Sequence, residues 1–357
     1  MNFYRHFLEE NVVEAAKRRF RHIFEHYDNV IIMFSGGKDS LVCVELARRV
    51  MIEEGIPFPL KIVFKDQELI PSAVLDFVRE YMLKDWTELH WFATPMSGTN
   101  SILGKAHKTI WWDPRREWVR EKPPWARTDH KFPATNPPSQ RKLDAWFYDA
   151  LDLKGSACFV TGVRTQESIT RYYSVVRKLS LPFIASSSVS HVKLGKPIYD
   201  WQENDVFAWF EREGIPYCPW YDAQLLTGVG LRVATAMHPC QVKRNESLQQ
   251  RDPDFYEAIL RVFPDIALNK RYFNEYDLEA GIKPYLGKGM AGVYAWIART
   301  YTGAKRQQAM STARMYGTAH RNSPEAYPSD HLLKHLARGK LWQQPMPLPK
   351  IHTQRKK

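Results

Sequence analysis

Cysteine is scarce in this 357-residue sequence, which contains only Cys43, Cys158, Cys218 and Cys240. No two of them form a Cys-x-x-C pair, so neither a disulfide framework nor an iron–sulfur cluster is expected. His238, Cys240 and Cys218 could make a partial zinc set, but buried thiols are the favoured interpretation. Apolar runs as long as a membrane span are missing, and the first six residues lack the apolar core of a signal peptide. These absences predict a cytoplasmic protein with no membrane partner.

Acidic residues are almost missing from the last quarter of the chain. Residues 281–357 contain 14 Lys and Arg but only Glu325 and Asp330 as acids, whereas residues 1–280 hold 37 basic and 37 acidic residues. All of the net charge of +12 therefore lies in residues 281–357. Such an asymmetry predicts an acidic partner, DNA or RNA above all, although a solvated tail and a protein partner remain open.

A strand, a two-glycine turn and a helix are predicted in immediate succession near the N-terminus. Residues 30–34 are a short apolar run of the kind found in buried strands, and residues 41–51 have helical spacing. The glycines between them let successive amides point to one place, where the helix dipole adds positive potential, so the turn is an anion site. Lys38 adds a mobile cation, and Asp39 is placed to hold Mg²⁺ against bound phosphates.

The turn reads Ser35-Gly-Gly-Lys-Asp-Ser40. It is not the common P-loop, because Asp39 stands where that motif has Ser or Thr. It resembles the pyrophosphate loop of the PP-loop superfamily. The resemblance implies an enzyme that splits ATP between its α and β phosphates and transfers AMP to a substrate oxygen. It also implies that the phosphates are held by Ser35, Gly36, Gly37, Lys38, Asp39 and Ser40.

Two acidic residues directly follow the second expected strand. Residues 60–64 and 87–92 read as strands separated by a helix over residues 72–83, and Asp66 and Glu68 come just after the first of these strands. Ligands of open parallel sheets gather at the carboxyl ends of strands. Asp66 and Glu68 are therefore candidates for contacts with the adenosine or the metal, unless they form an acidic turn that caps the next helix.

A fourth expected strand, residues 157–161, runs into Gly162-Val-Arg-Thr-Gln-Glu-Ser168. Gly162 and Arg164 would then reach the ligand edge, where a guanidinium grips phosphate or sulfate with two hydrogen bonds. Arg171 lies seven residues after Arg164, so the two share a face if a helix follows. The alternative is that Arg164 pairs with a local carboxylate such as Glu167.

Besides residues 35–40, three stretches indicate a more specific family resemblance. They are residues 162–168, Lys196-Pro-Ile-Tyr-Asp-Trp201 and Gly214-Ile-Pro-Tyr-Cys-Pro-Trp-Tyr-Asp222. They are similar to the phosphoadenosine phosphosulfate (PAPS) reductase family, in particular to its subgroup with the immunoglobulin-binding regulator A type and, more distantly, the ATP pyrophosphatases of DNA phosphorothioation. The resemblance implies an α/β fold with an open, doubly wound, mainly parallel sheet of the adenine nucleotide alpha hydrolase type. It further implies anion binding by Arg164 and Arg171 and an adenosine pocket between the ends of the first two strands.

The sequence departs from this family in one respect that bears on chemistry. PAPS reductases attack sulfate with a cysteine in a C-terminal Glu-Cys-Gly-Leu-His motif, and no cysteine follows Cys240 here. We therefore expect an ATP pyrophosphatase or adenylyltransferase in nucleic-acid or sulfur-related modification, with Lys38, Asp39 and Arg164 as catalytic residues. The alternatives are a PAPS reductase or sulfotransfer enzyme that uses Cys218 or Cys240, and a non-catalytic regulator whose nucleotide controls a DNA- or protein-binding surface.

The expected organisation is a nucleotide-binding domain over residues 1–230 and a basic, mostly helical region over residues 231–357 with a disordered tail. Further helices are expected at residues 3–26, 140–151, 254–263 and 292–301. Residues 108–138 are rich in Pro and Trp and should leave the sheet as a long excursion. Their aromatic and Arg side chains either stack on bases or an adenine, or form a small core that pins the loop.

Overall fold

The computed structural model of the chain describes residues 9–103, 105–138, 140–176, 181–225, 245–268 and 280–341, together with 345, 347 and 348. The chain divides into two compact units. Unit 1 consists of Met1–Gly98, Ile110–Ala236 and Glu246–Val262, and unit 2 of Thr99–Thr109, Met237–Asn245 and Phe263–Lys357. Residues 99–109, which we assigned to the first domain from the sequence, thus cluster with unit 2. No helix in these described ranges is long and apolar enough to cross a membrane.

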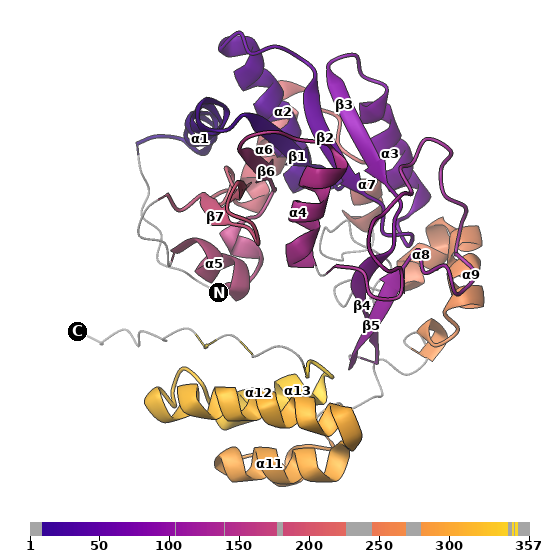
Figure 1. Cartoon of the computed structure of the whole chain (residues 1–357), viewed down its shortest axis with the longest axis vertical. Helices are drawn as coiled ribbons and strands as arrows, with labels where there is room; N and C mark the ends of the chain where they lie inside the picture. Colours follow the sequence, from indigo (N-terminus) through magenta and orange to yellow (C-terminus); the bar gives the residue numbers. More distant parts are fainter. Residues whose placement is uncertain are drawn as a thin grey trace. The chain divides into compact units, whose positions relative to one another are not determined.

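Unit 1 is built on a six-stranded sheet in the order β3-β2-β1-β6-β8-β7 (Figure 1). All neighbouring strands are parallel except β7 and β8. The branched side chains of Ile31 and Ile32 are fully buried, which explains why this apolar run forms a central strand. The strands are β1 (Asn29–Met33), β2 (Leu60–Lys65), β3 (Thr87–Phe92), β6 (Ala157–Val160), β7 (Ile184–Ser186) and β8 (Val192–Gly195).

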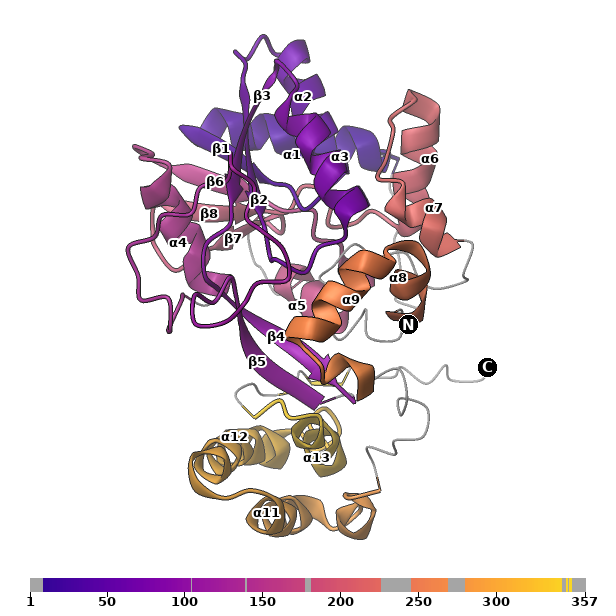
Figure 2. The same ribbon diagram turned by 90° about the vertical axis from the view of Figure 1, so that its right-hand side faces the viewer.

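Helices cover both faces of this sheet, so the predicted doubly wound α/β class is confirmed. Helices α1 (Val12–His26), α2 (Lys38–Glu53) and α3 (Ser72–Met82) lie on one side and α4 (Gln140–Ala150) on the other (Figure 2). Further helices described in unit 1 are η1 (Thr165–Glu167), α5 (Ile169–Val176), α6 (Glu203–Glu213), α7 (Trp220–Leu225), α8 (Asn245–Arg251, whose first residue clusters with unit 2) and α9 (Pro253–Val262).

The predicted strands and helices recur with small shifts in their ends. The largest shift is at the first helix, which begins at Val12 instead of residue 3; residues 3–8 lie outside the described part. Asn11 fixes this start because its Oδ1 accepts the amides of Val13 and Glu14 at 2.9 and 3.0 Å. Helix α2 begins at Lys38, three residues earlier than its apolar spacing indicates.

A separate two-stranded sheet, β4 (Met96–Ile102) and β5 (Lys105–Trp111), was not predicted. It extends into the start of the expected excursion, which is therefore not irregular throughout. Trp111 and Trp112 are buried where β5 ends, so these rings belong to a small core instead of an exposed stacking surface. Gly98 makes room for that core, since a Cβ there would lie 2.2 Å from Trp111 Nε1.

Unit 2 contains a compact helical bundle. It consists of η3 (Lys283–Tyr285), α11 (Gly289–Thr300), α12 (Gly303–Asn322) and α13 (Ser329–Ala337). The predicted helices at residues 254–263 and 292–301 correspond to α9 and α11. Residues 349–357 of the expected tail lie outside the described part. The core of the bundle is formed by Ile282, Val293, Trp296, Ile297, Ala309, Ala313, Tyr316, Leu332, Leu333, Leu336, Ala337 and Leu341.

Candidate nucleotide-binding site

The two-glycine turn joins β1 directly to α2, as the sequence predicts. The Phe34 amide still donates to Val63 O at 2.9 Å, so the chain leaves the sheet only after Phe34. Gly36 then has φ +72°, and a Cβ on it would lie 2.8 Å from Val74 Cγ1 of α3. Only glycine satisfies both the left-handed backbone and the close contact with α3 at this position.

Two serines tie the ends of the turn together. Ser40 Oγ donates to Gly37 O at 2.9 Å and accepts the Ser35 amide at 3.1 Å. The hydroxyl oxygens of Ser35 and Ser40 lie 3.0 Å apart. These bonds hold the turn in one shape, so the first amides of α2 and its positive dipole end are presented together at the carboxyl edge of the sheet.

The carboxyl end of β6 packs closely against the first turn of α2. A Cβ on Gly162 would lie 2.5 Å from the carbonyl carbon and oxygen of Asp39. No larger residue fits there without moving the backbone of one of the two elements. The absence of a side chain at Gly162 therefore allows the segment after β6 to bring Arg164 to the start of α2.

Two basic side chains and two carboxylates meet at this point. Arg164 Nε donates to Asp39 Oδ1 at 2.6 Å, and Lys38 Nζ lies 3.4 Å from Asp39 Oδ2 and 3.2 Å from Glu203 Oε1. Lys38 and Arg164 are each only 3% exposed. Their positive charges are therefore poorly screened by water, which strengthens the attraction of the turn for phosphate oxygens.

Three further residues of the site were not predicted from the sequence. Tyr221 Oη accepts the Lys38 amide at 2.8 Å, and the Tyr221 ring lies 5.4 Å from Lys38 Nζ. Burial, with the nearby Asp39 charge, raises the pKa of Tyr221 well above its usual value, so the residue stays a neutral phenol. Gln166 Oε1 accepts both Arg164 Nη1 and the Glu203 amide at 3.0 Å. Tyr221 and Glu203 reach Lys38 from distant parts of the chain, so their contacts with it do not follow from local patterns.

Asp39 has the chemistry that a magnesium ion requires. Its carboxylate is partly exposed, at 17%, and lies at the start of α2 among groups predicted to bind phosphate. Mg²⁺ prefers one or two carboxylates together with phosphate oxygens and water. Asp39, with Glu203 nearby, fits that donor set, and its ion pairs with Lys38 and Arg164 would rearrange when the ion binds.

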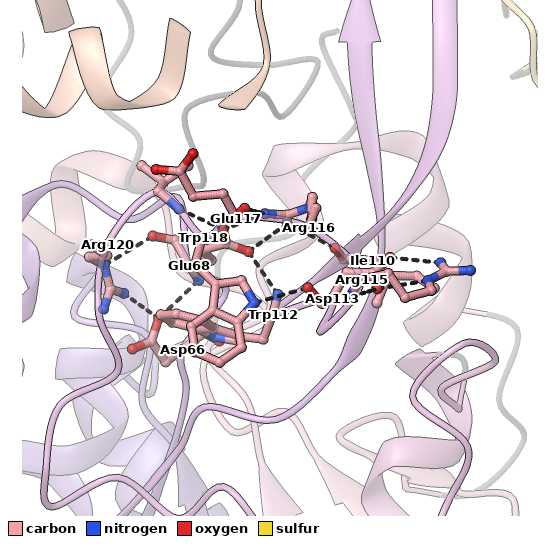
Figure 3. A network of polar contacts seen from close by, with 11 residues as sticks. Asp66, Glu68, Ile110, Trp112, Asp113, Arg115, Arg116, Glu117, Trp118 and Arg120 are labelled. Carbon is pink, nitrogen blue, oxygen red and sulfur yellow. Dashed lines mark hydrogen bonds and ion pairs between the residues drawn. The ribbon is translucent and has the colours of Figure 1, made fainter. Parts of the chain in front are cut away.

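The structure gives Asp66 partners in the excursion, in β3 and in its own turn. Asp66 Oδ1 accepts Arg120 Nη2 at 2.5 Å and the Glu68 amide at 2.9 Å (Figure 3). Asp66 Oδ2 accepts Trp91 Nε1 at 2.9 Å. Trp112 Nε1 donates to the Asp66 carbonyl at 2.6 Å. Both carboxylate oxygens of this fully buried side chain therefore already have donors.

Glu68 lies in the same network and is also fully buried. Arg116 donates to both of its carboxylate oxygens at 2.7 Å, the Trp112 amide donates to Oε2 at 2.7 Å, and the Val119 amide donates to Oε1 at 3.0 Å (Figure 3). Glu68 has φ +63°, a left-handed backbone that a bulky residue adopts only under constraint. Asp66 and Glu68 thus anchor residues 112–120 to the end of β2, and their predicted contact with adenosine or metal stays a prediction.

Arg164 and Arg171 do not share one continuous helix. The short helix η1 ends at Glu167, Ser168 is extended with φ −166° and ψ 156°, and α5 begins at Ile169. Arg171 pairs with Glu167, whereas the Arg164 guanidinium turns to Asp39. The alternative was that Arg164 pairs with Glu167. The contact seen between them is made by the Arg164 backbone amide, which donates to Glu167 Oε2 at 3.2 Å.

The described cysteines are buried thiols. Cys43, Cys158 and Cys218 are all free and enclosed. Burial raises the pKa of Cys158 to about 12 and that of Cys218 to about 11, and it also raises the pKa of Cys43. None of the three is a thiolate at neutral pH. Cys240 and His238, named above as candidates, lie outside the described residues.

Comparison with known proteins identifies the family of the chain. The phosphoadenosine phosphosulfate reductase domain family matches residues 29–259. The uncharacterized protein YbdN of Escherichia coli is 27% identical over 263 residues, covering 70% of this chain and 63% of that protein. Sulfate adenylyltransferase subunit 2 of Agrobacterium fabrum is 27% identical over 218 residues, covering 57% of this chain and 61% of that protein. The chain therefore spans about three fifths of the length of these curated relatives.

A solved structure with a similar arrangement is FMN adenylyltransferase of Candida glabrata in complex with ATP. It is 13% identical, covers 62% of this chain and 60% of its own, and has a TM-score of 0.41.

Proposed function

Since the chain belongs to the phosphoadenosine phosphosulfate reductase domain family, we propose that unit 1 binds ATP at residues 35–40 and splits it into AMP and pyrophosphate. The observation that supports this most is the convergence of Lys38, Asp39 and Arg164 on the fixed turn between β1 and α2. These groups match the needs of a leaving pyrophosphate, which carries several negative charges.

In the proposed reaction, a substrate oxygen attacks the α phosphorus while the bond from that phosphorus to the α,β-bridging oxygen breaks. The electron pair of that bond leaves with pyrophosphate, and AMP becomes attached to the substrate. The amides of the turn, the Lys38 ammonium and the Arg164 guanidinium would hold the pyrophosphate oxygens and stabilise the charge that develops there. Gly162 and Gln166 act indirectly by positioning Arg164.

Asp39 would hold the magnesium ion that accompanies the nucleotide. When bound, the ion supplies charge neutralisation between the phosphates. Arg164 and Lys38, freed from Asp39, would then turn to phosphate oxygens. This exchange of partners keeps two nearly buried cations paired both before and after the nucleotide binds.

The acceptor in this proposal belongs to nucleic-acid or sulfur-related modification. The charge of residues 281–357 favours a nucleic acid, because those residues contain 14 basic and only two acidic side chains. The direct test is pyrophosphate release from ATP, measured with and without added DNA or RNA. We expect release that requires both the polynucleotide and Asp39, so that Asp39→Asn abolishes it. Release that persists in Asp39→Asn would contradict the proposal, and tight ATP binding without any turnover would favour a regulator.

The alternative of thiol-driven PAPS reduction makes a different prediction for the cysteines. A pKa of about 11 leaves only a minute thiolate fraction of Cys218 at pH 8, so we expect iodoacetamide to label it far more slowly than the same residue in denatured protein. Labelling should speed up as the pH rises toward 11. Mass spectrometry of the labelled peptides measures this residue by residue.

Rapid labelling of Cys218 in the native protein at pH 8, together with thiol-dependent formation of sulfite from PAPS, would support the reductase instead. The variant Cys240→Ser separates the two remaining thiol candidates. Sulfite formation that survives in Cys240→Ser would assign the chemistry to Cys218, and sulfite formation that is lost would assign it to Cys240.

A further inference from the structure

Helices α11 and α12 of unit 2 lie in a segment without acidic side chains. Residues 281–324 contain seven Lys and Arg and no Asp or Glu. Asp330, which follows this segment, accepts the Gly287 amide at 3.0 Å through Oδ1. Its carboxylate is therefore hydrogen-bonded within the bundle. The basic charge of α11 and α12 is therefore not neutralised within the segment that carries it.

One face of helix α12 packs into the bundle, and the opposite face is exposed. Ala309, Thr312, Ala313 and Tyr316 are buried and face the core. At 3.6 residues per turn, Gln307, Ser311, Arg314, Thr318 and Arg321 fall within an arc of about 80° on the opposite side. All five are exposed. Within the described residues neither Arg314 nor Arg321 forms an ion pair.

The spacing of these side chains suits a polymer of phosphates. Arg314 and Arg321 are seven residues apart, which is about 10 Å along a helix. That rise corresponds to about three nucleotides along one strand of a B-form duplex. The 20 residues of α12 extend over about 30 Å. Guanidinium, amide and hydroxyl groups, which make up this face, are the side chains that most often contact phosphate and sugar in nucleic-acid complexes.

We propose that this face of α12, made of Gln307, Ser311, Arg314, Thr318 and Arg321, binds the phosphodiester backbone of a nucleic acid. The proposal extends the nucleic-acid part of the proposed function and does not depend on ATP cleavage. A membrane surface fits less well, because an interfacial helix needs an exposed apolar face, whereas the apolar face of α12 is buried in the bundle. Met315, which is 54% exposed, is the large apolar side chain that α12 exposes.

The test is fluorescence anisotropy of the full chain with labelled single- and double-stranded DNA and RNA of mixed sequence. For the wild type we expect the logarithm of the affinity to fall linearly with the logarithm of salt concentration between about 50 and about 200 mM. At the lowest salt concentration, the double variant Arg314→Gln, Arg321→Gln should bind about tenfold more weakly than the wild type. The slope of the logarithm of its affinity against the logarithm of salt concentration should be smaller by about 2.

The matched control is the double variant Arg18→Gln, Lys154→Gln, which removes the same charge from exposed positions of unit 1. It should keep the affinity and slope of the wild type. The proposal is overturned if the control and the α12 variant lose affinity equally, or if the wild type binds anionic lipid vesicles but no nucleic acid. Because the ATP reaction is measured separately, loss of one activity leaves the other as an independent result.

Discussion

Replacing Arg164 by Gln is expected to lower the kcat/KM of ATP-dependent pyrophosphate release by about 10²–10³-fold, the usual cost of removing a donor aimed at developing charge. Arg164 is 3% exposed, and Gly162 and Gln166 both hold it at the start of α2. A glutamine retains hydrogen-bonding capacity but neither the charge nor the fork of the guanidinium. The measurement is a coupled pyrophosphate assay over a range of ATP concentrations.

Two further variants make this expectation specific. Arg164→Lys keeps the charge without the planar fork, so its rate should fall between those of the wild type and Arg164→Gln. Arg212→Gln, which removes an exposed guanidinium that pairs with Glu213, should leave the rate unchanged. Thermal unfolding of all three variants checks that the fold is intact. An Arg164→Gln protein that folds normally and releases pyrophosphate within about threefold of the wild-type rate would remove Arg164 from the mechanism.

The parts of the site that the sequence predicts are those set by neighbouring residues. The apolar run before Ser35, the two glycines and the helical spacing after Lys38 each act over a few positions, so the strand, turn and helix follow from local rules. The same holds for the strand that ends before Gly162. Because parallel strands present their carboxyl ends on one edge, the approach of Arg164 to the turn also follows from the fold class.

The partners of buried charges depend on contacts far along the chain, and the sequence does not predict them. Tyr221 reaches the Lys38 amide across 183 positions, and Arg116 reaches Glu68 across 48. The short strands β4, β5 and β7 were also missed. In β4, Met96-Ser-Gly-Thr-Asn-Ser-Ile102, the reason is that the segment has few apolar side chains and no clear alternation. Pairing with β5, not intrinsic pattern, makes this segment a strand.

The placement of Glu68 separates two roles that the sequence leaves open, nucleotide contact and structural anchor. As an anchor, Glu68 accepts two hydrogen bonds from Arg116 and one each from the amides of Trp112 and Val119. Glu68→Gln replaces one acceptor oxygen by a donor and removes the negative charge that faces the guanidinium of Arg116, which is 22% exposed. We expect a loss of about 3 kcal/mol in the free energy of unfolding, at the low end of the cost of breaking a buried ion pair.

Glu117→Gln is the matched control for Glu68→Gln, because Glu117 belongs to the same segment and pairs with Arg261 while both side chains are about 60% exposed. It should change the free energy of unfolding by less than about 1 kcal/mol. Urea unfolding followed by the fluorescence of the neighbouring tryptophans measures both variants. If Glu68 instead contacts the nucleotide, Glu68→Gln would weaken ATP binding while matching Glu117→Gln in stability. An unstable Glu68→Gln protein whose folded fraction binds ATP as the wild type does would establish the anchor, since the carboxylate then stabilises the excursion without touching the ligand.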